Sequence, residues 1–301
     1  MMKGSARQAG LSGTCTAAGD DEGGAQDGII VQDLCAGYGR GMPEALSALS
    51  LTLSSGQLVA LVGPNGCGKS TLLKAIMGFV PIRSGSITLN GISVQCLDRR
   101  QMSRLVAYMP QDVICPEYAT AGDIVEMAGY GRYSLFGGPD GRDRRRFWEA
   151  LEAVGLLEHA GKAMSTLSGG QRQRAWIAMA LAQDSRIILL DEPVNHLDMK
   201  YQYAVLGLLR ALARDRGKTI LLVLHDLNLA AAFADRLVMM KEGSIVITGA
   251  VHRVMTADVI RSVYGVNADV FERNGRWVCL PAAQECRDVA ERLSDGHGNM
   301  S

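Results

Sequence analysis

The chain has 301 residues, and its 31 basic side chains balance 31 acidic ones. An apolar share of 48% with 21% charged residues excludes a largely disordered chain, and the charge balance argues against a protein that binds nucleic acid through a broadly basic surface. Apolar runs such as Thr219–Leu224 have the length of a strand, so no segment is expected to cross a membrane.

The two ends of the chain differ in composition from its middle. Residues 1–28 are rich in Gly, Ala, Ser and Thr and lack hydrophobic periodicity, which predicts a flexible tail. Residues 283–301 are polar and predict a second tail, with a short helix at Arg287–Leu293. No apolar segment follows Lys3 and Arg7, so we expect no secretory signal peptide.

Strand and helix signals alternate between these tails. The expected strands are, in chain order, Ile29–Leu34, Ala48–Leu53, Gln57–Val62, Ser86–Leu89, Arg104–Met109, Ile187–Leu190 and Thr219–Leu224. The expected helices are Lys69–Gly78, two segments of 121–157 on either side of Gly129–Gly141, Gln171–Gln183 and Lys200–Arg214. This alternation predicts a parallel sheet covered by helices, with the first two strands as edge strands of an antiparallel layer. The mainly helical stretch 112–184 predicts an inserted subdomain.

A glycine-rich segment follows the strand predicted at Gln57–Val62 and matches the phosphate-binding pattern G-x-x-x-x-G-K-[ST]. Its glycines let consecutive backbone N–H groups turn toward one anion, and the helix that follows adds unpaired donors. Lys69 can reach the outer phosphates of a nucleotide, and the Ser70 hydroxyl can bind Mg²⁺. The alternative, a turn without a ligand, does not explain the strand and helix on its two sides. The predicted nucleotide-binding residues here are Gly63, Pro64, Asn65, Gly66, Cys67, Gly68, Lys69, Ser70 and Thr71.

The seven cysteines are scattered and include no CxxC motif, so we expect reduced thiols rather than disulfides or a zinc site. Cys67 lies next to Gly68 and Lys69 and close to a predicted helix N-terminus, and these neighbours favour the reactive thiolate. Two interpretations remain open: a thiol whose alkylation a bound nucleotide prevents, or a buried and inert side chain.

A second candidate anion site is Leu167–Gln171, which has the sequence LSGGQ at the start of a predicted helix. One nucleotide does not need two such segments, so this one is a candidate for a nucleotide that a second copy of the chain holds. The alternative is a helix whose first turn Ser168 caps without any ligand.

Polar side chains end two of the predicted buried strands. Asp191 and Glu192 follow Ile187–Leu190, where one carboxylate can hold Mg²⁺ and the next can orient or deprotonate a water. His225 follows Thr219–Leu224 in the same way and can contact a phosphate. Because parallel strands end at one edge of a sheet, we expect these groups to lie together there.

With these motifs in this order, the chain from Ile29 to Pro281 resembles the ATPase subunit of an ATP-binding cassette (ABC) transporter. The matching segments are Gly63–Ser70 (Walker A), Gln111 (Q-loop), Leu167–Gln171 (signature), Ile187–Glu192 (Walker B), Asn195–Asp198 (D-loop) and His225 (switch histidine). The resemblance implies an α/β P-loop NTPase (RecA-like) fold over 29–282, with a parallel core, an antiparallel β layer and the α-helical subdomain inserted at 112–184.

The resemblance also implies ATP hydrolysis with Mg²⁺ in a head-to-tail dimer of the chain. ATP then lies between the Walker A segment of one copy and the signature of the other, with the residues Ser168, Gly169, Gly170, Gln171 and Asp198 at the nucleotide. Tyr38 is expected to stack on adenine. The implied general base is Glu192, and the implied Mg²⁺ ligands are Ser70, Gln111 and Asp191. Gln111 is also implied to contact the attacking water, and His225 to contact the γ-phosphate. Val194 is a departure, because many members have threonine there.

A closer resemblance is to importers of iron(III)-siderophores, haem and cobalamin, through Gly131–Tyr133, Leu167–Leu181 and His225–Leu229. It favours iron(III)-siderophore import, with cobalamin or haem as the alternative. It implies two membrane permease subunits, indirectly a substrate-binding protein, and a peripheral position on the cytoplasmic face of the inner membrane. The stretch Glu117–Gly141 is expected to dock the permease through apolar anchors, unless these complete the subdomain core; the anchors are Tyr118, Tyr130, Tyr133, Leu135 and Phe136.

Two other classes remain as alternatives. Soluble ABC ATPases of translation usually carry two cassettes in a chain, whereas this chain carries one, and those of DNA repair insert a long coiled coil. Here only 56 positions separate Gln111 from Leu167, without sustained heptads. An exporter ATPase fits the importer-type runs less well. The basic run Arg142–Arg146 is broken by Asp143 and predicts a solvated helix face, so we expect no nucleic-acid partner.

Overall fold

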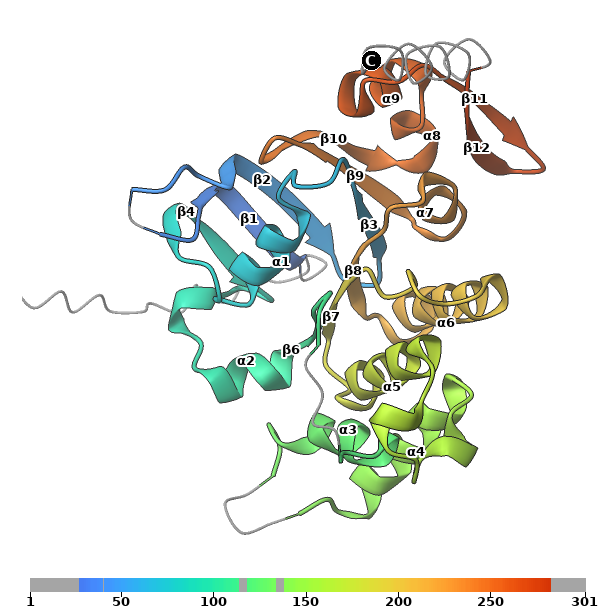
Figure 1. The fold of residues 1–301 in the computed structure, drawn as a ribbon. Coiled ribbons are helices and arrows are strands. Elements are labelled where there is room, and N and C mark those ends of the chain that lie inside the picture. Colours follow the sequence, from blue (N-terminus) through green and yellow to red (C-terminus); the bar gives the residue numbers. More distant parts are fainter. Residues whose placement is uncertain (1–26, 40, 114–117, 134–137, 283–301) are drawn as a thin grey trace, which may run out of the picture.

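A computed structural model describes residues 27–39, 41–113, 118–133 and 138–282 (Figure 1). The predicted tails therefore lie outside the described residues, except for Asp27 and Gly28, which begin the first strand. The predicted helix Arg287–Leu293 and the predicted anchors Leu135 and Phe136 also lie outside them.

Six strands among the described residues form the central sheet, in the order β10-β9-β3-β8-β7-β6. Their bounds are β3 Leu58–Val62, β6 Val106–Met109, β7 Ile187–Asp191, β8 Thr219–Val223, β9 Arg236–Lys241 and β10 Ser244–Ala250. All neighbours are parallel except β10, which pairs antiparallel with β9. Every residue of β3, β7 and β8 is buried, which accounts for the apolar runs Leu58–Val62, Ile187–Leu190 and 220–223 within them. The predicted parallel sheet is confirmed.

A separate antiparallel sheet has the order β2-β1-β4-β5. Its strands are β1 Asp27–Ala36, β2 Leu46–Ser54, β4 Ile82–Leu89 and β5 Ile92–Ser93. The predicted antiparallel layer is confirmed, but the prediction of Ile29–Leu34 as an edge strand is wrong. β1 pairs with β2 on one side and with β4 on the other, because β4 begins four residues before the predicted Ser86. The polar run Arg83–Ser86 hides this start from an apolar pattern.

Helices cover the central sheet and extend beyond it (Figure 1). Their bounds are α1 Lys69–Ile76, α2 Arg99–Leu105, α3 Ala121–Glu126, α4 Gly141–Ala153, α5 Gly169–Ala182, α6 Met199–Arg216, α7 Leu227–Phe233, α8 Val251–Val254 and α9 Ala257–Tyr264. Short 3₁₀ turns lie at Val94–Cys96, Met127–Gly129, Leu157–His159 and Met164–Thr166. Helices α3, α4 and α5 pack against one another at the end of the molecule away from the antiparallel sheet.

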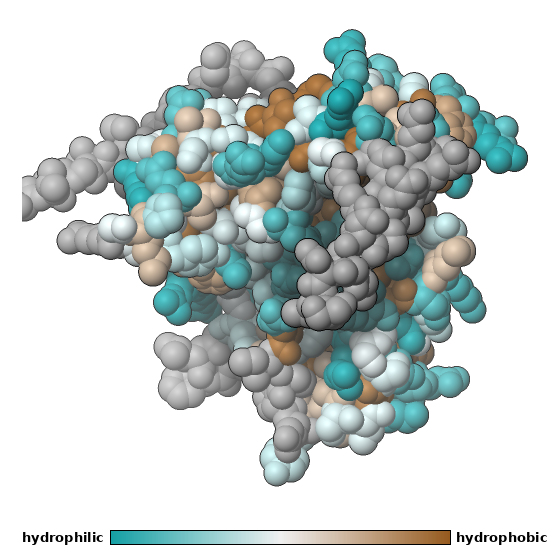
Figure 2. Space-filling view, turned by 45° about the horizontal axis from the view of Figure 1, so that its top comes forward, coloured by the Kyte–Doolittle hydropathy of each residue, from teal (hydrophilic) through white to brown (hydrophobic). Residues whose placement is uncertain are grey.

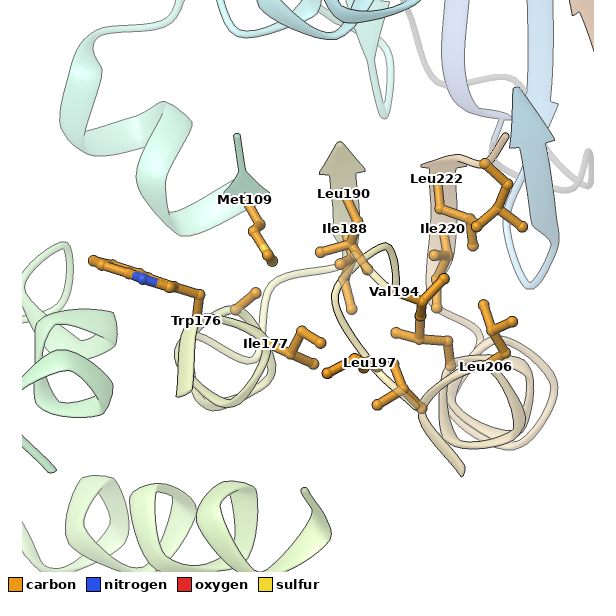
Figure 3. Close-up of a cluster of buried hydrophobic side chains, with 14 of the residues drawn as sticks. Met109, Trp176, Ile177, Ile188, Leu190, Val194, Leu197, Leu206, Ile220 and Leu222 are labelled. Atoms are coloured by element: carbon orange, nitrogen blue, oxygen red, sulfur yellow. The ribbon is translucent and has the colours of Figure 1, made fainter. Parts of the chain in front are cut away.

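Two buried clusters lie on opposite faces of the central sheet. One joins α5, α6 and the helices α3 and α4 to alternate residues of the strands, including Ile188, Leu190 and Leu222 (Figure 3). The other joins α1 and the antiparallel sheet to the opposite face through Val59, Leu61 and neighbouring residues. Each fully buried Leu or Ile contributes about 1.5–3 kcal/mol, so both helices α1 and α5 are held firmly against the sheet.

The segment after residue 225 contains elements that the sequence patterns did not predict. β9 and β10 complete the central sheet on the side of β3, and the hairpin β11 Ala268–Arg273 and β12 Arg276–Pro281 lies beside α7. The Asn228 side chain of α7 bonds the backbone of Cys279 twice, donating to its carbonyl at 3.2 Å and accepting from its N–H at 2.8 Å. This pair of bonds fixes the hairpin next to the loop that carries His225.

No described helix is long and apolar enough to cross a bilayer, and on the face in Figure 2 apolar residues are scattered among polar ones. Cys35, Cys67 and Cys279 carry free thiols, as predicted. Cys96 takes part in a disulfide, so the expectation of reduced thiols is wrong there. The spacing of cysteines in a sequence does not reveal which of them meet on folding.

Candidate functional site

The candidate site lies at the carboxyl ends of three adjacent strands, β3, β8 and β7. The loop Gly63–Gly68 follows β3, and His225 follows β8. Asp191 is the last residue of β7, and Glu192 comes directly after it. The parallel sheet therefore brings the predicted residues to one edge, as expected from the sequence.

The loop between β3 and α1 depends on glycine. Gly63 and Gly68 have φ of 152° and 103°, which other residues rarely adopt. A Cβ atom on Gly63 would lie 2.2 Å from the Met240 carbonyl oxygen, and one on Gly68 would lie 2.9 Å from Leu46. Gly68 gives α1 no side-chain cap, so the first N–H groups of this helix are available to an anion.

Lys69 is the charged group of this loop. Its side chain is buried, and Nζ donates to the carbonyl oxygens of Gly63 at 2.8 Å and Pro64 at 2.9 Å. The ammonium group thus lies inside the curve of the loop, where it can meet phosphate oxygens.

Tyr38 lies beside this loop. Its hydroxyl is 3.2 Å from the hydroxyl of Thr71, which is buried in the first turn of α1. Tyr38 is 56% exposed, so its aromatic side chain is accessible to a planar ligand.

Asp191 is fully buried, and neither of its carboxylate oxygens has a hydrogen-bond partner among the described residues. Burial raises the pKa of the Asp191 carboxyl above its usual value; the nearby Ser70 hydroxyl opposes this rise without meeting hydrogen-bond geometry. An unpaired buried carboxylate is costly unless a cation neutralises it. Asp191 and the Ser70 hydroxyl therefore fit Mg²⁺, which prefers oxygen ligands.

No cluster of three or more His, Cys, Asp or Glu side chains within the described ranges forms a metal site. A metal ion at Asp191 would thus take most of its ligands from phosphate and water oxygens. Gln111 is exposed after β6 and lines a cavity of about 370 Å³ with Gly169, Gln173 and Trp176. The structure therefore places Gln111 beside the start of α5.

Glu192 is held from both sides. Its carboxylate contacts Nε2 of His225 and accepts a hydrogen bond from Nδ2 of Asn195, and its side chain is only 11% exposed. The sequence patterns predicted Glu192 and His225, but they gave no role to the Asn195 side chain. A carboxylate fixed in this way can accept a proton from one position.

The backbone of Glu192 adopts a conformation that is rare for its residue type. Its φ is 55°, in the left-handed region, although the following Pro193 favours extended backbone at this position. Such a conformation costs about 1–3 kcal/mol and persists only where surrounding contacts hold it. One of these contacts comes from α5: Nε2 of Gln173 lies 3.2 Å from the carbonyl oxygens of both Glu192 and Pro193.

The signature segment forms the N-terminus of α5. Ser168 accepts from the N–H of Gln171 at 3.2 Å, while the Gln171 side chain accepts from the Ser168 N–H at 2.9 Å. The capping interpretation is thus realised in the structure. Ser168 and Gly169 are also exposed, so this helix end is accessible to a ligand. α5 and α1 cover opposite faces of the sheet, so the two glycine-rich segments approach the site from different layers.

The D-loop connects the site to α6. Asp198 caps α6 by accepting from the N–H of Tyr201 at 3.1 Å. Val194 is buried in the cluster that joins α5 to α6, near Ile177 and Leu206 (Figure 3). Valine in place of threonine therefore serves the packing of this loop.

Cys67 faces the interior of the protein. Its side chain is only 4% exposed and belongs to the cluster behind α1. The structure thus favours the buried, inert interpretation of this thiol over the reactive one.

A family model described as "ABC transporter" matches residues 46–195. The iron(3+)-hydroxamate import ATP-binding protein FhuC of Bacillus subtilis is 37% identical, over 81% of this chain and 91% of its own length. The ferric enterobactin transport ATP-binding protein FepC of Escherichia coli is 36% identical, over 80% and 88%. The hemin import ATP-binding protein HmuV of Bordetella bronchiseptica is 36% identical, over 77% and 90%.

Solved structures are similar over most of the chain. A putative metal-chelate type ABC transporter in an inward-facing conformation superposes with a TM-score of 0.72 and 26% identity, covering 86% of this chain and 98% of its own. A bacterial ABC transporter cassette solved as a dimer has a TM-score of 0.68 and 30% identity, covering 74% and 98%.

Proposed function

The chain belongs to the ATP-binding subunits of ABC transporters, and from this we propose that it energises the uptake of iron(III)-siderophore complexes through a membrane permease. It is an ATPase of the P-loop class, of a family whose cassettes work as dimers. The observation that carries the substrate proposal is similarity over most of the chain to subunits of ferric hydroxamate and enterobactin importers. The hemin relative makes haem the second candidate.

An uptake experiment tests this substrate class. Cells that lack this chain are expected to lose uptake of labelled iron(III)-hydroxamate and to keep uptake of hemin and cobalamin. Loss of hemin uptake alone would instead assign the chain to the haem importers. Permease subunits that co-purify with the chain from its native membrane identify the transport system.

The geometry of the site supports a role for each residue in hydrolysis. The loop Gly63–Ser70 and the ammonium of Lys69 hold the phosphates, and the exposed ring of Tyr38 stacks on adenine. Glu192 accepts the proton of the attacking water, because His225 and Asn195 hold its carboxylate in one place. His225 also contacts the γ-phosphate.

The buried carboxylate of Asp191, the Ser70 hydroxyl and Gln111 are the proposed ligands of Mg²⁺. When Mg²⁺ is bound, it neutralises part of the negative charge on the phosphates. The support for this assignment is the unpaired state of Asp191 within the described part of the chain.

Asp191→Asn should stabilise the protein without Mg²⁺ and abolish the additional stabilisation that Mg²⁺ gives when ATP is present. The raised pKa means that the folded protein loses stability as the pH rises and Asp191 ionises, whereas at low pH this loss is absent. We therefore expect the variant to unfold roughly 2–4 °C above the wild type at pH 8 in EDTA, and this difference to vanish at about pH 3, below the ordinary pKa of an aspartate. Calorimetry with and without Mg²⁺ measures this. The exposed control Asp215→Asn should not change either value; equal behaviour of both variants contradicts the assignment.

The second copy completes the nucleotide site in this proposal. ATP bound to Gly63–Ser70 of one chain contacts Ser168–Gln171 of the other, which is accessible at the exposed end of α5. Two permeases and a substrate-binding protein complete the transporter, with this chain at the cytoplasmic face of the inner membrane.

The permease is proposed to dock on the side of the molecule that carries α2 and the segment 118–133. A groove of about 650 Å³ there is lined by Phe79, Leu97, Met102 and other mostly apolar residues. Arg100 and Arg104 of α2 tie this groove to the following segment, since they donate to the carbonyl oxygens of Tyr133 and Gly131 at 2.6 and 2.9 Å.

The predicted anchors of this segment divide into two groups. Tyr118 and Tyr130 are 90% and 66% exposed, as a docking surface requires. Tyr133 instead packs against the subdomain core and meets the Tyr130 ring edge-on at 5.7 Å. The core interpretation therefore holds for Tyr133 alone among the described anchors.

Cysteine cross-linking in the reconstituted transporter is expected to join Tyr118→Cys and Tyr130→Cys to a cytoplasmic helix of the permease. Large exposed aromatic side chains commonly anchor such interfaces, so the same positions should be protected from labelling in the complex. The control is Val246→Cys on the edge strand β10, which is also exposed. Cross-links from Val246→Cys but from neither tyrosine position would place the permease elsewhere.

A further inference from the structure

Helix α5 connects two parts of the proposed nucleotide sites, the signature segment and the backbone of Glu192. Its first turn begins at Ser168, in the segment proposed to contact the ATP of the second copy. One turn later, Nε2 of Gln173 donates to the carbonyl oxygens of Glu192 and Pro193, each at 3.2 Å. Along α5, the signature and the residue that bonds the backbone of the proposed base are thus about one helical turn apart.

The Glu192 carboxylate depends on this backbone for its position. Asn195 and His225 hold the end of the side chain. The main chain from which it extends is held in the left-handed region, and the amide of Gln173 bonds the carbonyls of this turn. Loss of these bonds leaves a strained peptide, next to a proline, free to relax and carry the carboxylate with it.

Packing behind this contact makes it stiff. Ile177 of α5 lies on the side of Ile188 and Leu190 of β7, and these three side chains are buried in one cluster (Figure 3). Trp176 is buried in the same cluster but points the other way, away from β7 (Figure 3). Leu197 of the D-loop is buried in the same cluster. Close-packed side chains transmit a small shift rather than absorb it. A movement of α5 therefore moves the Gln173 amide with it.

We propose that Gln173 is a positioning residue that couples the signature end of α5 to the placement of Glu192. The inference rests on the proposed function, in which Ser168 contacts the nucleotide of the second copy and Glu192 acts on the nucleotide of its own chain. Gln173 thereby links the two nucleotide sites of the dimer: contact of ATP with one face of α5 sets the carboxylate that hydrolyses the other ATP.

The direct test is Gln173→Met, which keeps the length of the side chain and removes the donor. We expect kcat to fall roughly ten- to a hundredfold, as misplacement of a catalytic group by a fraction of an ångström to an ångström does. The Kd for ATP and the unfolding temperature should stay unchanged, and the Hill coefficient for ATP should fall toward one. A lower unfolding temperature and a higher Kd for ATP together with the lower kcat would mean that Gln173 only supports the fold, and would overturn the inference.

Gln202→Met is the matched control. Gln202 donates from α6 to the neighbouring Val194 carbonyl at 3.2 Å, so it offers the same bond to the same loop without a connection to the signature. This variant should keep the wild-type kcat and Hill coefficient. An equal loss in both variants would show a general requirement for a rigid loop, against the specific coupling.

A double variant separates this inference from the proposed function. Because Gln173 acts through Glu192, adding Gln173→Met to Glu192→Gln should lower the residual rate no further. An additional tenfold loss in the double variant would show that Gln173 acts elsewhere. Near-normal hydrolysis by Glu192→Gln alone would overturn the general base of the proposed function. A slow Glu192→Gln with a wild-type Gln173→Met would overturn only the coupling.

Discussion

Glu192→Gln is expected to bind MgATP as the wild type does and to hydrolyse it about a hundredfold or more slowly. The amide keeps the shape of the side chain and can still meet His225 and Asn195, but it cannot accept the proton of the attacking water. ATP then persists between the two copies, so the variant should accumulate as a dimer when ATP is added.

Turnover assays and size-exclusion chromatography with ATP measure these two effects. Glu149→Gln is the control, because Glu149 lies on the exposed face of α4 in an ion pair with Arg145. This variant should hydrolyse ATP at the normal rate and keep the monomer–dimer equilibrium of the wild type. A Glu192→Gln variant that turns over near the normal rate removes Glu192 from the role of base.

Lys69→Ala is expected to lower kcat/KM about a hundredfold or more, because it removes the buried ammonium group from the centre of the phosphate loop. The glycine backbone and the N-terminus of α1 remain, so residual nucleotide binding is expected. Circular dichroism should show an unchanged fold, since Lys69 bonds only the loop itself in the described structure.

Lys74→Ala is a demanding control for Lys69→Ala. Lys74 lies on the same helix just over one turn further on, and its charge partly opposes the rise that burial causes in the pKa of Asp191. A modest loss, smaller than tenfold, is therefore expected from Lys74→Ala through this effect. Equal losses in nucleotide affinity and turnover from both variants would contradict the assignment of Lys69 to the phosphates.

The central sheet could be predicted because its strands are buried on both faces. Leu58–Val62, Ile187–Leu190 and Thr219–Val223 are continuous apolar runs, and the polar residues after them define a common edge. The predicted strand at Ser86–Leu89 began too late, because Arg83–Ser86 has no alternation of apolar and polar residues. The backbone of this segment nevertheless pairs with β1, whatever its side chains are. Sequence patterns report burial well and backbone pairing poorly.

In the candidate site, too, sequence patterns identify residues by type and order but not by the contacts that the folded chain makes. Gly63–Ser70, Asp191, Glu192 and His225 belong to patterns whose chemistry follows from residue type and order. Gln173 and Asn195 act through contacts with the backbone and side chain of Glu192, and such contacts depend on geometry that only the folded chain provides. The direction of the Cys67 thiol is likewise set by the turn of the loop and not by its neighbours in the sequence.

The order of the central sheet affects how the protein is made. β3 is the first strand of this sheet to leave the ribosome, yet its partners in the finished sheet are β8 and β9, which begin at Thr219 and Arg236. At bacterial and eukaryotic synthesis rates these partners follow roughly 10–30 s later. Throughout that interval an apolar strand and the phosphate loop attached to it have neither neighbour. The nascent chain should therefore depend on chaperones until the last third of its sequence has emerged, and pausing translation before Thr219 should promote its aggregation.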